Sequence, residues 1–133
     1  TALIAQRDVA AYVIDCLPNM KDDLVAERVE PLVHTLRAAK PDVPIILVES
    51  IEPQAAWFIP ATEQAYKSKN ALLRSIYERL QAEGVGHLHY IPCDDLFGHD
   101  HEATVDGVHA TDLGFLRMAD AIEPYLRAAL GQP

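Results

Sequence analysis

Asp106 and His109 lie three residues apart in the polar stretch that leads into the last apolar segment of the chain. At this spacing a carboxylate can accept a hydrogen bond from an imidazole, orient the ring and prepare it for general-base catalysis. In acyl transfer, such a pair activates a hydroxyl nucleophile. The alternative interpretation is a polar helix-capping loop that happens to contain a histidine, because short Asp/His spacings also arise by chance.

The chain offers three serines as nucleophiles for that pair, namely Ser50, Ser68 and Ser75. None of them lies in the glycine-flanked turn after a strand that typically exposes a nucleophilic serine. Ser68 and Ser75 fall inside a predicted helix and are expected at its surface. Ser50 ends a predicted strand and is the only local candidate. We therefore expect the attacking atom to lie outside this chain.

Three short apolar runs alternate with three longer segments whose apolar residues recur at helical spacing. The expected strands cover residues 10–15, 45–48 and 87–91, and the expected helices cover residues 22–40, 63–83 and 111–130. Strands separated by helices pair in parallel through right-handed crossovers, so the pattern predicts a three-layer α/β sandwich. Ligands bind such sheets at the carboxyl ends of the strands. The loops at that edge contain Asn19, residues 50–57 and residues 94–109.

The last predicted helix begins at Thr111, whose hydroxyl is a good N-terminal cap. Its apolar residues recur at the spacing of one helical face. The expected buried stripe consists of Leu113, Leu116, Ile122, Leu126 and Leu130. The loop that carries Asp106 and His109 would thus follow the third strand and precede a capped helix.

The first expected strand, residues 10–15, is too apolar for an exposed edge, because unpaired edges of natural sheets are usually short or charged. Three strands also make a small sheet for this kind of domain. We therefore expect residues 1–133 to be the C-terminal part of a single domain, with one or two strands and their helices missing before Thr1. A homo-oligomer that pairs with the strand at residues 10–15 is the alternative.

The composition argues against several classes of function. A net charge of −9 disfavours binding to nucleic acid or to an anionic membrane surface. No apolar run is long enough to cross a bilayer. Cys16 and Cys93 are too few and too far apart for a disulfide framework or a zinc knuckle. No targeting segment is visible, which leaves the compartment open, and no cofactor is expected.

Two segments match the motifs of a known family. Asp106-Gly-Val-His109-Ala-Thr-Asp-Leu-Gly114 is similar to the last sequence block of the SGNH (GDSL-type) hydrolases, and Val13-Ile-Asp-Cys-Leu-Pro-Asn19 falls where that family has its third block. The chain resembles the C-terminal portion of this family of small esterases and lipases, which have a flavodoxin-like sheet. Two departures are the missing Gly-Asp-Ser and glycine blocks, and Ala110 at a position usually held by proline.

The resemblance implies a role for each matched residue. His109 would be the base, Asp106 would orient it, and the Asn19 side chain would donate a hydrogen bond to the oxyanion. The implied activity is hydrolysis of small acyl or carbohydrate esters by a serine outside this chain. The alternative is a flavodoxin-like binding or assembly module, or a pseudoenzyme, that keeps the fold without the nucleophile.

Other residues allow further interpretations. Trp57 and Phe58 could line a pocket for an acyl or sugar group, although loop aromatics more often anchor a loop to the protein body. The run His99-Asp-His-Glu102 contains ligand types for zinc, but a solvated acidic loop is the default, so no metal site is predicted. The remaining histidines, His34, His87 and His89, are interpreted as structural, with His89 satisfied within the core or on a sheet face.

Overall fold

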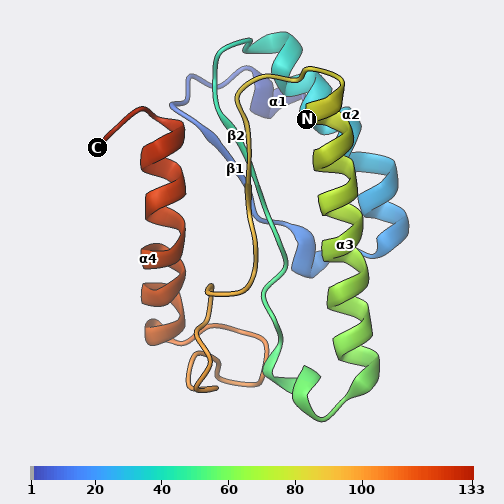
Figure 1. Ribbon diagram of the computed structural model, residues 1–133, viewed down its shortest axis with the longest axis vertical. Coiled ribbons are helices and arrows are strands. Elements are labelled where there is room, and N and C mark those ends of the chain that lie inside the picture. Colours follow the sequence, from blue (N-terminus) through green and yellow to red (C-terminus); the bar gives the residue numbers. More distant parts are fainter. Residues whose placement is uncertain (1) are drawn as a thin grey trace.

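A parallel sheet of three strands forms the centre of the molecule (Figure 1). The computed structural model describes residues 2–133. The strands are β1 (Tyr12–Ile14), β2 (Ile45–Val48) and β3 (Leu88–Ile91), and they lie side by side in that order. All four residues of β2 are fully buried, as expected for a short apolar strand that is covered on both faces.

The helices cover both faces of the sheet. They are α1 (Ala2–Ala5), α2 (Asp22–Ala39), α3 (Pro60–Ala82) and α4 (Asp112–Ala129), together with the 3₁₀ turns η1 (Leu17–Asn19) and η2 (Gln54–Trp57). Figure 1 shows α2 and α3 on one side of the sheet and α4 on the other. Alternate residues of β2 divide the core accordingly: Ile45 and Leu47 pack with α2 and α3, while Ile46 and Val48 pack with α4. The predicted three-layer arrangement is confirmed.

Helix α3 begins earlier than the apolar spacing predicts, at Pro60 instead of residue 63. Proline is favoured in the first turn of a helix, because its missing N–H would have no intrahelical partner there. The backbone N–H groups of Thr62 and Glu63 both donate to the carbonyl of Ile59, which closes this first turn. At the other end, Gly84 follows the helix with φ +83°, the left-handed conformation in which a glycine commonly ends a helix.

The buried face of α4 differs from the predicted stripe at its N-terminal end. Leu113 and Leu116 are 41% and 59% exposed, so their predicted burial is wrong. Gly114 is the buried residue of this turn, and a Cβ atom there would lie 2.2 Å from the carbonyl oxygen of Ala103. This close approach directs the Gly114 side of the helix toward the body and turns both leucines outward. Farther along, Ile122 and Leu126 pack against the sheet as predicted.

Strand β1 forms one edge of the sheet within residues 2–133, and Val13 at its centre is 42% exposed. An apolar edge with this exposure agrees with the prediction that the sheet is incomplete. The opposite edge strand, β3, contains His89, whose Nε2 is buried without a hydrogen-bond partner in the described part of the chain. The interpretation of His89 as a satisfied residue is therefore wrong. None of the described helices has both the length and the apolar composition needed to span a membrane.

Candidate active site

The carboxylate of Asp106 binds His109 through both of its oxygens. Oδ2 lies 2.7 Å from Nδ1 of the imidazole, and Oδ1 accepts the backbone N–H groups of Val108 and His109 at 3.0 and 2.8 Å. Hydrogen bonds from the His109 backbone and ring, followed by the Val108 N–H, hold the pKa of Asp106 well below its usual range. Asp106 is therefore an ionised acceptor at neutral pH, which places the proton on Nδ1 and leaves Nε2 to accept another.

A short antiparallel bridge closes the loop that contains this pair. Thr104 pairs with Ala110, and the Val105 N–H donates to the His109 carbonyl at 2.8 Å. At the tip, Gly107 has φ +89°, a conformation that side chains rarely tolerate. The tip also lies against η2, because a Cβ atom at Gly107 would be 3.4 Å from the Ala55 nitrogen. The loop is thus a defined turn and not an irregular connection.

Helix α4 fixes the end of the same loop. The Thr111 hydroxyl accepts the Gly114 N–H at 3.1 Å, which confirms the predicted cap. The Thr111 N–H in turn donates to the Ala103 carbonyl at 2.9 Å, beside the close contact of Gly114 with that carbonyl. Three contacts thus position His109 relative to α4 and the sheet: the Thr111 cap, the contact of Gly114 with Ala103, and the Thr104–Ala110 bridge.

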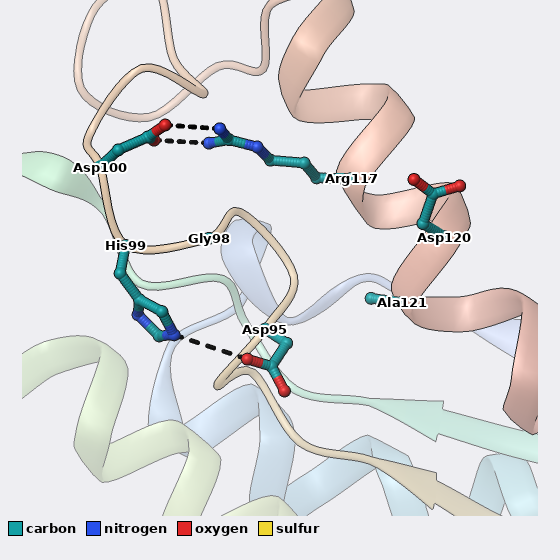
Figure 2. Close-up of a pocket in the computed structure, with 7 residues that line it drawn as sticks. All are labelled: Asp95, Gly98, His99, Asp100, Arg117, Asp120 and Ala121. Carbon is teal, nitrogen blue, oxygen red and sulfur yellow. Dashed lines mark hydrogen bonds and ion pairs between the residues drawn. The ribbon is translucent and has the colours of Figure 1, made fainter.

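An ion pair holds the preceding segment of the loop to α4. Figure 2 shows the Asp100 carboxylate facing both terminal nitrogens of Arg117, and Nη1 lies 2.6 Å from Oδ1. The same Nη1 donates to the Phe97 carbonyl at 2.9 Å. The Arg117 hydrogen bonds hold the pKa of Asp100 well below its usual range. Sequence reasoning did not single out this pair, because its members are separated by 17 residues and share no periodic pattern.

The histidine of the pair is open to solvent. Its side chain is 81% exposed, and that of Asp106 is 54% exposed. Asp106 engages the Nδ1 side of the ring, so another segment could bring a hydroxyl to Nε2 from solution. Asn19 lies at the same edge of the sheet, because β1 and β3 run parallel and both loops follow carboxyl ends. Within residues 2–133, no hydrogen bond joins the Asn19 side chain to the Asp106–His109 pair.

Ser50, the only local serine candidate, is enclosed. It is 1% exposed, and the side chain of Asn70 binds both its N–H and its carbonyl, at 2.8 and 2.9 Å. Its hydroxyl lies 3.3 Å from the Ile51 carbonyl. Cys93 is not a strong alternative, because burial, with a smaller contribution from Glu49, raises the pKa of its thiol to about 12. Neither residue offers an accessible nucleophile at neutral pH.

A buried polar cluster at the end of β2 is a further feature that sequence reasoning missed. Glu49 accepts hydrogen bonds from the Tyr90 hydroxyl, from the Cys93 N–H at 2.9 Å and from Arg74 at 2.9 Å. Burial raises the pKa of Glu49, but the Tyr90 and Cys93 hydrogen bonds and the Arg74 charge together lower it. The cluster ties β2 to β3 and to α3 below the loops of the candidate site.

Trp57 and Phe58 project from the end of η2 and do not anchor it. They are 82% and 66% exposed, with their rings in edge-to-face contact at a centroid distance of 6.1 Å. Trp57 lines a cavity of about 230 Å³ between η2 and the loop after β3. Their assignment to a substrate pocket stays a prediction.

The structure does not gather three metal-ligating atoms in the segment from His99 to Glu102. His99 instead faces Asp95, with Nε2 3.5 Å from Oδ1 (Figure 2). Within the described residues, the group of three whose ligand atoms converge is Glu30, His34 and Glu83, on the side of the molecule formed by α2 and α3. Glu30 already pairs with Arg79, whose positive charge opposes cation binding at that position.

The sequence model that describes the GDSL-like lipase/acylhydrolase family matches residues 1–127 of the chain. The chain belongs to this family. The resemblance inferred from the segments around Asn19 and His109 is thereby confirmed at the level of the family. No curated protein sequence matches the chain.

Solved structures agree with the family assignment. A protein from Bacteroides ovatus described as a GDSL-like lipase is 34% identical to the present chain, with a TM-score of 0.91. The match covers 96% of the present chain and 38% of the Bacteroides protein. The salicylyl-acyltransferase SsfX3 from a tetracycline biosynthetic pathway is 18% identical to the present chain, with a TM-score of 0.76. At this identity the likeness supports a shared fold only. The match covers 97% of the present chain and 40% of SsfX3. The chain thus spans less than half the length of either structure.

Proposed function

We propose that this chain supplies the base, its orienting carboxylate and one oxyanion donor to a serine-type hydrolase of small carboxylic esters. The observation that carries the proposal is the 2.7 Å contact between Asp106 and the Nδ1 atom of His109, with the imidazole otherwise exposed. Family membership supports acyl chemistry of this type. The nucleophile is proposed to come from a polypeptide segment outside residues 1–133.

In this mechanism, Nε2 of His109 takes the proton of the serine hydroxyl while its oxygen attacks the ester carbonyl. Asp106 stabilises the resulting imidazolium through Nδ1–H. The Asn19 amide donates to the oxygen on which negative charge develops. The imidazolium then gives its proton to the departing alkoxide, and water repeats the sequence on the acyl-enzyme to release the acid.

Within residues 2–133, β1 pairs on one side only, and its other edge is where we place the strand that carries the proposed serine. A parallel strand paired with β1 would end at the same edge of the sheet as Asn19 and the Asp106–His109 loop. The 42% exposure of Val13 on this strand supports such a partner. That strand could come from the same polypeptide or from another chain.

The test uses the natural polypeptide that contains this chain, with p-nitrophenyl acetate as the substrate. A His109→Ala variant should lose about a thousand-fold or more in kcat/KM, while a His34→Ala control on the α2 surface should keep its activity. If the His109→Ala variant hydrolyses the ester at the wild-type rate, the assigned base is wrong.

A non-catalytic module is the second candidate, because Ser50 is buried and residues 2–133 present no accessible serine beside His109. A fluorophosphonate probe distinguishes the two functions. Covalent labelling of a serine in the natural polypeptide, abolished by His109→Ala, supports the hydrolase. Absence of labelling, together with absence of esterase activity, supports the binding module.

A further inference from the structure

The side chain of Lys69 reaches from α3 to η1, the turn that ends with Asn19. Its Nζ atom lies 3.1 and 3.3 Å from the carbonyl oxygens of Leu17 and Pro18. These are the two residues of η1 that precede Asn19, and an ammonium has enough protons to donate a hydrogen bond to each carbonyl. The turn follows β1 and lies beside α3 (Figure 1). Lys69 therefore connects a long helix to the turn that carries the proposed oxyanion donor.

The neighbouring Ser68 holds the other end of the same segment. Its hydroxyl donates to Oδ2 of Asp22, the first residue of α2, at 2.5 Å. Asn19 thus lies between two attachments to α3, one at residues 17 and 18 and the other at residue 22. The partners are 46 to 52 residues apart, so the local sequence around Asn19 gives no sign of them.

The two sides of η1 are held in different ways. Leu17 is 1% exposed, and its carbonyl also accepts the Met20 N–H at 3.0 Å, so packing and a local hydrogen bond fix the start of the turn. Pro18 and Asn19 are exposed. Burial does not fix that half of the turn, and the hydrogen bond from Lys69 to the Pro18 carbonyl acts there.

The surroundings of Lys69 differ from those of a surface lysine on the same helix. Its side chain is partly buried, which lowers its pKa, while the charge of Asp22 raises it. An ammonium that has lost water depends more on protein acceptors than a solvated one does. Lys67, two residues earlier, pairs with Glu63 and has a side chain that is 60% exposed. The two lysines therefore allow a matched comparison between an internal contact and a surface ion pair.

We propose that Lys69 is a positioning residue, which fixes η1 and thereby aims the Asn19 amide at the oxygen on which negative charge develops. This inference rests on the proposed hydrolase function and assigns no proton transfer to Lys69 itself. A hydrogen-bond donor to an oxyanion acts through its position, and a displacement of about 1 Å can cost about a hundred-fold in rate. The ammonium also places a positive charge within one residue of that donor, which favours the same developing negative charge.

The first test measures ester hydrolysis by the natural polypeptide that contains this chain. Lys69→Met keeps an unbranched side chain without the charge or the donors, and it should lower kcat for p-nitrophenyl acetate about ten-fold or more with KM nearly unchanged. Lys69→Arg keeps the charge and the donors in a different geometry, so its kcat should be intermediate. Lys67→Met is the matched control and should have the wild-type kcat. A wild-type kcat in Lys69→Met would overturn the proposal.

A double-mutant cycle separates positioning of Asn19 from a general effect on stability. Asn19→Ala removes the oxyanion donor and should lower kcat about a hundred-fold. If Lys69 acts through Asn19, the addition of Lys69→Met to Asn19→Ala should lower kcat no further. Multiplication of the two single losses would show that Lys69 acts independently of Asn19, and its positioning role would be rejected.

Hydrogen exchange tests the contact without reference to catalysis. Amide exchange in a peptide that covers residues 17–24, followed by mass spectrometry, should be faster in Lys69→Met than in the wild type or in Lys67→Met. Unchanged exchange would show that Lys69 does not hold η1. Faster exchange in a polypeptide whose wild type hydrolyses no ester would retain the contact but reject the hydrolase, and the catalytic role of Lys69 with it. An active hydrolase that is insensitive to Lys69→Met would reject the role of Lys69 alone.

Discussion

Two carboxylates near the carboxyl edge of the sheet, Asp106 and Glu49, both have a pKa below the ordinary value, but for different physical reasons. Asp106 is exposed, and hydrogen bonds from His109 and Val108 stabilise its charge. Glu49 has a side chain that is only 5% exposed, and its hydrogen bonds must overcome burial. A lowered pKa is therefore shared by an exposed and an enclosed carboxylate, and the two differ in their access to solvent.

The sharpest test of this difference is Asp106→Asn. The amide would offer an N–H to Nδ1 and favour the wrong tautomer of His109, so kcat/KM should fall by about 10⁴-fold, as in the Ser-His-Asp template. Thermal unfolding followed by circular dichroism should be nearly unchanged, because the carboxylate is exposed. A variant that keeps full activity would show that Asp106 does not orient the base.

Glu49→Gln should have the opposite profile. Its neutral amide weakens the contacts with Arg74 and Tyr90, so the free energy of unfolding should fall by about 2–3 kcal/mol in urea titrations. The remaining kcat/KM of folded protein should stay within a few-fold of the wild type. A large loss of activity without a loss of stability would place Glu49 in catalysis and remove the distinction drawn here.

The same residue predicts a pH dependence of stability. Because folding lowers the pKa of Glu49 from its ordinary value of 4.5, the unfolded state binds more protons in acid. The stabilisation is complete above that value and is lost as the pH falls through the lower pKa of the folded state. Urea midpoints measured from pH 7 to pH 3 should decline less steeply for Glu49→Gln than for the wild type.

Gly114→Ala tests whether the close contact of α4 with Ala103 positions the loop that contains Asp106 and His109. The added Cβ would meet the Ala103 carbonyl at 2.2 Å, so we expect a loss of about 1–2 kcal/mol in unfolding free energy and lower esterase activity. Gly86→Ala is the matched control, because a Cβ there has no neighbour within 4 Å. Equal stability of the two variants would contradict this account of the α4 contact.

The smallest expected effect concerns His89. Burial, followed by the charges of His87 and Arg37, lowers its pKa from 6.5, so protonation of the unfolded state destabilises the fold increasingly below that pH. His89→Leu removes the unpartnered nitrogen and should stabilise the protein by about 1 kcal/mol, with a smaller loss of stability between pH 7 and pH 5. A destabilised variant would show that a hydrogen-bond partner is present in solution.

The elements of the fold follow from local patterns. Apolar runs and helical spacing predicted all three strands and the three long helices, because each pattern reports burial along a single element. The Asp106–His109 spacing and the Thr111 cap were equally readable, since their partners lie three residues apart and the geometry is local. The family resemblance rested on these same local features.

The accessibility of the polar residues and the orientation of α4 depended on contacts between distant segments. Ser50 lies two residues after β2, yet Asn70, twenty residues away, binds its backbone N–H and carbonyl, and Ser50 is only 1% exposed. Leu113 and Leu116 match an apolar stripe, but the contact of Gly114 with Ala103 decides which side of α4 faces inward. The sequence by itself determined the elements of the fold and the Asp106–His109 pair, whose members lie three residues apart. Only the tertiary structure decided which polar groups remain accessible, because burial depends on packing between segments that local periodicity does not specify.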